Sequence, residues 1–396
     1  MLRKMSTPIL TGIFACGLLA GACQSGKTLH SAPAPLASPD ALATPSTQPR
    51  VKNVIFMIGD GMGITQMTAG RLREFGPNSK SRIESMPVTG LAHTHSIDDL
   101  ITDSAASATA LATGYKTRNG MIGMLPDMTS AKTLLEAAAE AGKKTGVVAT
   151  SSVTHATPAS FTAHVALRKM EPQIAEQQAS GNVDVILGAG LQFFQPMSTE
   201  GSDRRDNRDL LAEARENGFQ VVRSADEMAA ITDGRILGLF APKYLSGLAG
   251  EPSLTEMTNK AISLVKDDPD GFFLMIEGSQ IDWGGHDNDP EYVIREMIAF
   301  DKAVQAALDF AEADGQTLVV VTADHETGGM SITKGSFGGD SLEVKWTTGK
   351  HTGTPVGVFA YGPGSLRFTG VFDNTELPRI IDDLWQLPDF PQVLSE

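Results

Sequence analysis

The sequence predicts an α/β fold, a layered α/β/α sandwich around a central, mostly parallel β-sheet. Short apolar runs recur along the chain, and helical patterns lie between them. Such runs are typical of strands buried on both faces, and their alternation with helices is typical of a parallel sheet. The predicted strands are 54–58, 146–149, 183–187, 272–276, 317–322 and 356–360, and the clearest helices are 132–140 and 291–313.

Polar residues follow or end several of these predicted strands. Asp60 comes just after the first strand, Glu277 directly follows the run 272–276, and Asp324 and His325 follow the run 317–322. Ligand sites in open α/β sheets collect at the carboxyl ends of the strands. We therefore expect these side chains to converge, although the pattern alone does not give their chemistry.

The composition limits the possible partners. The chain has 396 residues, is 41% hydrophobic and carries a net charge of −15. This length suits one large domain or two ordinary ones. A strongly acidic chain is a poor partner for nucleic acid. It would also repel a phosphate ester, so local cations must offset the overall charge wherever such an ester binds.

Residues 1–22 have the pattern of a signal peptide, with Arg3 and Lys4 before an apolar stretch too short to span a membrane. The segment that ends at Cys23 resembles a bacterial lipoprotein box, so we expect export to the periplasm with a lipid on Cys23. Cleavage after Ala22, giving a soluble periplasmic protein, is the alternative. Residues 23–50 read as a tether rich in Pro, Ala and Ser, and 51–396 as the folded domain.

The segment from Thr102 to Ala110 is rich in small residues, which favours a tightly packed helix. Asp103 is a suitable N-cap, which places Ser104 at the helix N-terminus. The positive end of the helix dipole favours an anion there, either an alkoxide or a phosphate. An ordinary capped alanine-rich helix would explain the same pattern.

Candidate metal ligands occur in three later segments. Asp282 and His286 are four residues apart with two glycines between them, so both can turn onto one cation. Zinc accepts such mixed oxygen and nitrogen ligands, although a surface loop would have the same spacing. Asp324 and His325 lie at a strand exit, where a buried charge needs a partner. His351 lies just before another predicted strand.

Taken together, these segments resemble the bacterial alkaline phosphatase family. The motifs that carry the resemblance occur in the family's order, and they are 53–63, 103–106, 277–286, 322–325 and 351–353. The resemblance covers residues 53 to about 361. It implies an alkaline phosphatase-like catalytic domain at 51–396 that hydrolyses phosphate monoesters through a phosphoserine intermediate. It also implies a homodimer.

The resemblance implies two zinc ions and one magnesium ion per subunit. The implied ligands of one zinc are Asp282, His286 and His351. The implied ligands of the second zinc are Asp60, Asp324 and His325, with Ser104 as a labile ligand. The magnesium would bind to Asp60, Glu277 and Thr157. Arg168 is implied to bind the phosphate.

Two positions depart from the best-known bacterial enzymes. His155 stands where those enzymes carry an aspartate, and Trp283 stands where they carry a lysine. A subset of the family, including enzymes from cold-adapted and marine bacteria, is similar to this sequence at both positions. Both changes remove polar or charged support around the third metal and the phosphate, so the zinc pair is more firmly implied than the magnesium site.

The implied chemistry is physically consistent. Two metal ions about 4 Å apart can clamp the attacking and leaving oxygens of an in-line displacement. A nearby zinc lowers the pKa of the Ser104 hydroxyl, so that no histidine base is needed. The planar fork of Arg168 matches two phosphate oxygens. Two successive in-line steps predict retention of configuration at phosphorus.

Three other functions fit parts of the pattern. A sulfatase needs a Cys/Ser-x-Pro-x-Arg context, which Ser104 lacks, and phosphodiesterases of this superfamily usually carry threonine as the nucleophile. A non-catalytic zinc or phosphate-binding lipoprotein would tolerate the loss of Ser104 or Arg168.

Among the remaining residues, we expect His164 to be structural, His93 and His95 to share one face of a strand, and 201–208 to form a solvated loop.

Overall fold

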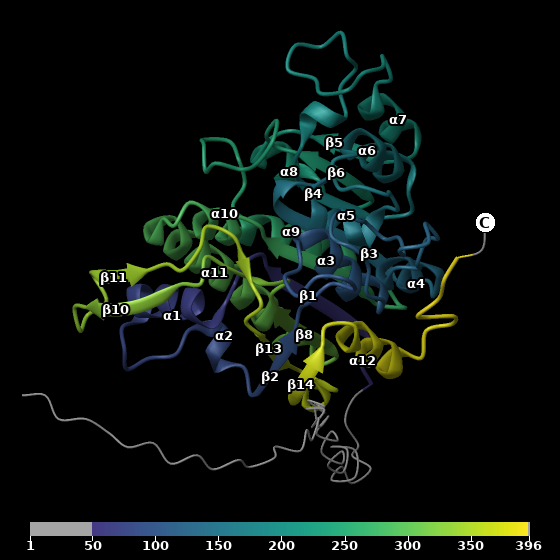
Figure 1. The fold of residues 1–396 in the computed structure, drawn as a ribbon. Helices are drawn as coiled ribbons and strands as arrows, with labels where there is room; N and C mark the ends of the chain where they lie inside the picture. Colours follow the sequence, from purple (N-terminus) through teal and green to yellow (C-terminus); the bar gives the residue numbers. More distant parts are fainter. Residues whose placement is uncertain (1–49, 395–396) are drawn as a thin grey trace, which may run out of the picture. The chain divides into compact units, whose positions relative to one another are not determined.

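The computed structural model describes residues 50–394. There, a ten-stranded sheet is flanked by helices (Figure 1), which confirms the predicted fold class. In sheet order the strands are β14 (Gly370–Asp373), β2 (Val88–His93), β13 (Val356–Tyr361), β8 (Thr317–Thr322), β1 (Asn53–Gly59), β7 (Phe272–Gly278), β3 (Lys144–Ser152), β4 (Val185–Ala189), β6 (Arg235–Leu239) and β5 (Phe219–Val222). The expected signal peptide at 1–22 and nearly all of the tether at 23–50 lie outside the described residues.

The sheet is parallel except at one strand. β13 runs antiparallel to both of its neighbours, β2 and β8, whereas every other pairing in this sheet is parallel. The central strands β1, β7 and β8 are buried along their whole length. This burial explains why their sequences are continuous apolar runs rather than alternating ones.

The helices lie in two layers. Phe272 and Phe273 are neighbours in β7, and neighbouring residues of a strand point to opposite faces of the sheet. The ring of Phe272 is 5.8 Å from that of Phe310 in α11 (Pro290–Asp314), and the ring of Phe273 is 6.0 Å from that of Phe161 in α5 (Ala156–Thr162). Helices α11 and α5 therefore cover opposite faces (Figure 1).

The α-helices are α1 (Ile64–Phe75), α2 (Arg82–Ser85), α3 (Ser104–Thr113), α4 (Leu134–Glu140), α5 (Ala156–Thr162), α6 (Glu171–Ser180), α7 (Leu210–Glu216), α8 (Ala225–Ala230), α9 (Leu254–Val265), α10 (Ile281–His286), α11 (Pro290–Asp314) and α12 (Glu376–Trp385). Two short 3-10 helices are η2 (Leu191–Phe193) and η3 (Ser365–Phe368). The predicted helices at 132–140 and 291–313 are confirmed as α4 and α11. Within residues 50–394, no helix is both long and apolar enough to cross a membrane.

The local sequence explains where α11 begins and ends. The Asp289 side chain accepts hydrogen bonds from the N–H groups of Glu291 and Tyr292, and Pro290 occupies the first turn. An acidic cap followed by proline favours a helix start. At the other end Gly315 adopts a left-handed conformation with φ of 70°, which favours glycine as the terminating residue.

The register of the central strands brings polar residues to one edge of the sheet. Ile58 in β1 lies opposite Glu277 in β7 and Thr322 in β8. Asp60 follows Ile58 by two residues, and Asp324 follows Thr322 by two. Asp60 and Asp324 therefore emerge level with each other, two residues beyond the level of Glu277, at the carboxyl ends where the sequence predicted a site.

Two small ladders lie outside the main sheet. β9 (Glu326–Thr327) pairs with β12 (His351–Thr352), and β10 (Ser331–Gly335) pairs with β11 (Leu342–Lys345). The first pairing places His351 directly opposite Thr327, two residues from His325. The second forms a largely exposed hairpin, so the chain between His325 and His351 holds no additional domain, as its length predicted.

Candidate active site

Ser104 lies at the buried N-terminus of α3. The helix is buried at every position, which explains its small residues, and Ser104 itself is 2% exposed. Asp103 caps the helix, because its Oδ1 accepts a hydrogen bond of 2.9 Å from the N–H of Ala106. The Oγ of Ser104 lies 3.2 Å from Nε2 of His325. The hydroxyl therefore lies where the helix dipole stabilises negative charge, next to a histidine that could bind a metal ion.

Arg168 is held beside this helix by the same aspartate. Its Nη1 donates to Oδ2 of Asp103 at 3.1 Å, and its Nη2 lies 3.2 Å from Nε2 of His155. The sequence predicted Asp103 only as a cap. Its second contact could not be foreseen, because Arg168 is 65 residues away in the chain and no local pattern links the two.

Asp282, His286 and His351 form the first candidate metal cluster. The Nε2 atoms of His286 and His351 lie 3.3 Å and 3.4 Å from the Asp282 carboxylate and 3.1 Å from each other. Each ring uses Nδ1 to bond a backbone carbonyl, that of Gly349 or Thr102, at 2.9 Å. These outer bonds orient Nε2 of each ring toward Asp282, which leaves that nitrogen as the one that would bind a metal ion. The surface-loop alternative is wrong here, because α10 is a helix that sets Asp282 and His286 one turn apart.

Asp60, Asp324 and His325 form the second cluster, and all three are fully buried. The Nε2 of His325 lies 3.1 Å from Asp324 Oδ2 and 3.6 Å from Asp60 Oδ1. The N–H of Gly61 donates to the other Asp324 oxygen at 3.1 Å. Asp282 also approaches this cluster, since one of its ligand atoms lies within 4.8 Å of those of Asp60 and His325. The first two clusters therefore adjoin.

Asp60, Glu277 and His155 form the third cluster, with ligand atoms within 4.8 Å of one another. Glu277 Oε2 accepts hydrogen bonds from Ser279 at 2.6 Å and from Ser151 at 3.4 Å. His155 directly precedes α5, which also carries Thr157. Neither serine was predicted as part of the site, although both lie at or just beyond the carboxyl ends of strands.

Several buried polar atoms of these clusters have no hydrogen-bond partner among the described residues. Leaving such atoms unpaired costs about 1–3 kcal/mol each, and more when the group is charged. The atoms are both carboxylate oxygens of Asp60, Oδ2 of Asp324, Oε1 of Glu277, Oγ1 of Thr157 and Nδ1 of His155. Carboxylate, hydroxyl and imidazole donors suit zinc and magnesium, so these residues fit bound divalent cations.

The pKa values show the same need for positive charge. Burial, reinforced by Asp324, Asp282 and Glu277, raises the pKa of Asp60 well above its usual range. Burial also raises the pKa of Glu277 to about 7. Bound cations would reverse both shifts by stabilising the carboxylates. Burial lowers the pKa of His155 to about 4, so its ring is neutral at neutral pH.

In the first cluster, hydrogen bonds from the histidines already favour the charged form of Asp282. Burial alone would raise the pKa of Asp282, but the hydrogen bonds from His286 and His351 outweigh it and hold that pKa well below its usual range. The bond to Asp282 in turn raises the pKa of His286 to about 9. Zinc would have to displace this proton, so we expect metal binding at this cluster to release protons.

Trp283 lies beside the third cluster, with its ring edge-on to those of His155 at 6.1 Å and Tyr244 at 5.1 Å.

His164 is structural, as predicted, because Nδ1 bonds the carbonyl of Gly123 and Nε2 bonds Glu136. His93 ends β2 and His95 lies beyond it, next to Asp373, so the expectation of one shared strand face is wrong for His95.

The loop at 201–208 also differs from expectation at one residue. Arg204 is only 3% exposed, whereas a fully solvated loop was predicted. Its guanidinium bonds Asp206 and Glu176 and two backbone carbonyls. Of these partners only Asp206 is local, whereas Pro172, Glu176 and Phe193 are 32, 28 and 11 residues away, so the alternating charges of the loop gave no sign of burial.

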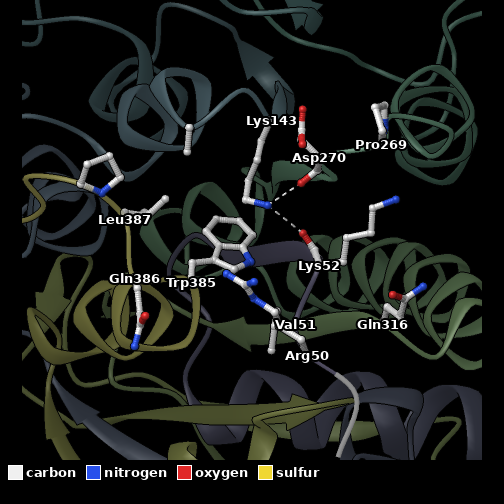
Figure 2. Close-up of a pocket in the computed structure, with 12 residues that line it drawn as sticks. Arg50, Val51, Lys52, Lys143, Pro269, Asp270, Gln316, Trp385, Gln386 and Leu387 are labelled. Carbon is white, nitrogen blue, oxygen red and sulfur yellow. Dashed lines mark hydrogen bonds between the residues drawn. The ribbon is translucent and has the colours of Figure 1, made fainter.

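A separate cavity of about 360 Å³ lies where several strands begin, at the edge of the sheet away from the clusters. Lys143 donates to the carbonyls of Asp270 at 2.6 Å and Lys52 at 3.2 Å, and its Nζ lies 4.6 Å from the Trp385 ring centroid (Figure 2). These bonds tie together the segments that enter β1, β3 and β7. The cavity contains none of the candidate metal ligands.

Comparison with known proteins supports a single family. The alkaline phosphatase family model matches residues 51–342. Alkaline phosphatase 3 of Bacillus subtilis is 38% identical, over 84% of this chain and 88% of that protein. The solved alkaline phosphatase of the Antarctic bacterium TAB5 is 38% identical with a TM-score of 0.78, over 86% of this chain and 99% of that one.

A further solved structure is a variant of the TAB5 enzyme, in which a histidine is replaced by aspartate and magnesium is bound in the M3 site. It is 36% identical to this chain with a TM-score of 0.76, over 86% of this chain and 99% of that one. The sequence match, the shared fold and the three adjoining clusters agree. The chain belongs to the alkaline phosphatase family, and it is a metal-dependent phosphomonoesterase.

Proposed function

We propose that Ser104 is the nucleophile of this phosphatase and that a phosphoserine forms on it. The observation that carries the proposal is the position of the Ser104 hydroxyl, 3.2 Å from His325 at the N-terminus of a buried helix. Arg168 is fixed next to it by Asp103. A hydroxyl, an anion-stabilising helix end and a guanidinium are the groups that a phosphoryl transfer to serine needs.

Two zinc ions and one magnesium ion are proposed for the three clusters. Asp282, His286 and His351 would hold one zinc, and Asp60, Asp324 and His325 the other. Asp60, Glu277 and Thr157 would hold the magnesium, with His155 beside them. When bound, these ions neutralise the phosphate dianion and favour ionisation of the Ser104 hydroxyl. The unpaired buried oxygens of Asp60, Asp324, Glu277 and Thr157 support this assignment.

The protein groups then act as follows. Arg168 offers two parallel N–H groups to two phosphate oxygens, and its bond to Asp103 keeps the guanidinium from turning away. Ser104 attacks phosphorus in line with the departing alcohol, and the dipole of α3 stabilises the negative charge near its N-terminus. Water then cleaves the phosphoserine from the opposite direction. The two inversions give overall retention at phosphorus.

The third site is proposed to be the weakest of the three. His155 supplies a neutral ring where a carboxylate would supply a charge, and burial keeps the pKa of that ring at about 4. The TAB5 variant with magnesium in its M3 site carries aspartate in place of a histidine. This agrees with a site that binds magnesium better when a carboxylate is present.

The enzyme is also proposed to be exported to the periplasm as a homodimer. Residues 1–22 would be removed, and residues 23–50 would link a lipid on Cys23 to the catalytic domain at 51–396. Mass spectrometry of the mature N-terminus distinguishes the lipid-bearing form, which begins at Cys23, from a soluble form. Sedimentation of the purified protein gives the number of subunits.

The covalent step is tested by trapping the intermediate. The enzyme is denatured in acid during hydrolysis of p-nitrophenyl phosphate, and the peptide that contains α3 is analysed for added phosphate. Wild type should carry phosphate on Ser104, and Ser104→Ala should lose both the label and nearly all turnover. Ser107→Ala is the matched control in the same helix, because it removes a buried hydroxyl but should still give phosphate on Ser104. A label on any other residue would refute the role of Ser104.

A further inference from the structure

A pocket of about 330 Å³ opens next to the third cluster, and its walls carry both polar and aromatic side chains. We call it the Gln192 pocket, and the side chains that define it are Glu171, Gln192, Asp203, Lys243, Tyr244 and Trp283. His155 also lines it, and the Nε2 of His155 lies 3.2 Å from Arg168 Nη2. The pocket therefore begins one side chain away from the proposed phosphate clamp.

The amide of Gln192 points to a ligand. The residue is 6% exposed and lines the pocket, and in residues 50–394 its amide is neither bonded to another protein group nor among the fully buried polar atoms, so it stays accessible from the pocket. An accessible amide without a protein partner can offer its N–H groups and its carbonyl oxygen to a polar ligand. The backbone of Gln192 is fixed, since its carbonyl accepts a hydrogen bond of 3.0 Å from the N–H of Asp203. A donor and an acceptor are thus held ready on the pocket wall.

Arg204 fixes three segments of this wall to one another. Its guanidinium donates to the carbonyls of Pro172 at 3.1 Å and Phe193 at 3.3 Å, next to Glu171 and Gln192 respectively. Arg204 itself directly follows Asp203 in the chain. Arg204 therefore holds wall segments from different parts of the chain in fixed positions. Such a preformed pocket is typical of small-molecule sites.

Part of the pocket lining is aromatic. The ring of Tyr244 lies 5.1 Å from that of Trp283, in an edge-on arrangement. The loop that carries Tyr244 is anchored, because the N–H of Leu245 donates to the carbonyl of Thr150 at 2.9 Å and Gln280 donates to the carbonyl of Leu245 at 2.7 Å. Fixed aromatic faces can pack against the C–H groups of a ring while polar groups bind its hydroxyls.

The charges of the pocket favour a neutral ligand. Glu171 and Asp203 are both acceptors for hydroxyl groups, and both would repel a ligand that carries further negative charge. Lys243 is the one cation among the side chains that define the pocket. The volume is at the small end of the range for small-molecule sites, which is about 300–1,000 Å³, and suits a single ring.

We propose that the Gln192 pocket binds the alcohol portion of the substrate and that it prefers a polyhydroxylated ring, so that sugar phosphates are a favoured class of substrate. This inference rests on the proposed function, because it takes the phosphate to lie between Ser104 and Arg168. It assigns the specificity to Gln192 and its neighbours and gives them no part in the chemical step.

The test compares two substrates of the metal-loaded enzyme, glucose 6-phosphate and p-nitrophenyl phosphate. Gln192→Leu keeps the side-chain size but removes both hydrogen-bonding groups. It should lower kcat/KM for glucose 6-phosphate about tenfold, mainly through KM, because at least one hydrogen bond to a sugar hydroxyl is lost. For p-nitrophenyl phosphate kcat/KM should change less than about twofold, since that leaving group has no hydroxyls to bind.

Gln220→Leu is the matched control, because Gln220 is an exposed glutamine on β5 outside the pocket. It should leave both substrates unchanged. The inference is overturned if Gln192→Leu leaves glucose 6-phosphate hydrolysis intact, or if it slows both substrates equally, which would mark a structural role. If the wild-type enzyme hydrolyses neither substrate, the proposed function fails instead, so the two failures are distinguishable.

A second variant tests the charge preference. Asp203→Lys reverses the charge of one wall and should raise kcat/KM for fructose 1,6-bisphosphate relative to glucose 6-phosphate by about threefold, the effect expected of an exposed charge. An unchanged or lowered ratio would contradict the proposed role of the acidic wall.

Discussion

The carboxylate of Asp103 holds Arg168 with one oxygen and caps the helix of Ser104 with the other. Oδ2 accepts from Arg168 Nη1 at 3.1 Å, and Oδ1 accepts from the N–H groups of Ala106 at 2.9 Å and Gly120 at 3.0 Å. One side chain thus fixes the relative positions of the proposed nucleophile and the proposed phosphate-binding group. Its removal should affect stability and phosphate binding together.

Asp103→Ala should destabilise the protein by about 1 kcal/mol through loss of the cap. It should also weaken inhibition by inorganic phosphate about tenfold, because Arg168 loses a charge-assisted hydrogen bond. Asp103→Asn separates the two effects, since the amide oxygen can still cap the helix. Thermal unfolding and phosphate inhibition constants provide the measurements, and unchanged inhibition in the alanine variant would contradict the role of Asp103.

His155→Asp should strengthen magnesium binding at the third cluster. The substitution replaces a neutral ring with a carboxylate next to Asp60 and Glu277, and magnesium prefers oxygen ligands. Metal analysis after dialysis should show a higher magnesium content than in wild type, with zinc content unchanged. An equal magnesium content in the two proteins would show that His155 does not limit this site.

Arg204→Ala should lower the free energy of unfolding by about 1–3 kcal/mol, because it leaves the carbonyls of Pro172 and Phe193 without their hydrogen-bond donor. Arg205→Ala is the control at the next position. Arg205 is exposed and makes no ion pair in residues 50–394, so its loss should change stability by less than about 0.5 kcal/mol. Urea unfolding of both variants measures the difference, and equal effects would mean that Arg204 does not brace this region.

The His164–Glu136 pair predicts a dependence of stability on pH. Burial opposes both charges, but their mutual hydrogen bond and attraction raise the pKa of His164 and lower that of Glu136. The contribution of protonated His164 to stability is fully present below its pKa in the unfolded chain, near 6.5. It is lost as the pH rises through the raised pKa of the folded protein. The contribution of ionised Glu136 to stability is fully present above its pKa in the unfolded chain, about 4.5. It is lost as the pH falls through the lowered pKa of the folded protein.

The pair should therefore stabilise the fold most between about pH 4.5 and 6.5. His164→Gln should cost up to about 1 kcal/mol in that window and less at pH 9, because Glu136 is partly exposed and its charge is screened. Urea unfolding at pH 5.5 and pH 9 measures both values. A cost that is the same at the two pH values would rule out the charged form of this pair.

The strand predictions succeeded because they rested on buried strands. The continuous apolar runs of β1, β7 and β8 cannot face water on either side, so they required covering helices and a parallel sheet. The convergence of Asp60, Glu277 and Asp324 followed from the same reasoning, since parallel neighbours end at the same edge. The direction of a strand was harder to predict from the sequence. The run 356–360 is as apolar as the other predicted strands, yet β13 is antiparallel to its neighbours.

Residues whose partners are distant in sequence could not be predicted. The sequence around Arg204 alternates in charge like a solvated loop, and only the fold brings Pro172, Glu176 and Phe193 to it. The pocket around Gln192 was missed for the same reason. Its residues come from α6, η2, α10 and separate loops, and apart from α10 none of these segments has a motif of its own.

Zinc-edge anomalous diffraction from crystals grown with zinc and phosphate would locate the zinc ions and the phosphate relative to Ser104. We expect one zinc peak bounded by Asp282, His286 and His351, a second bounded by Asp60, Asp324 and His325, and a phosphate between these ions, Ser104 and Arg168. Zinc peaks elsewhere, or a phosphate that does not contact Ser104, would contradict it.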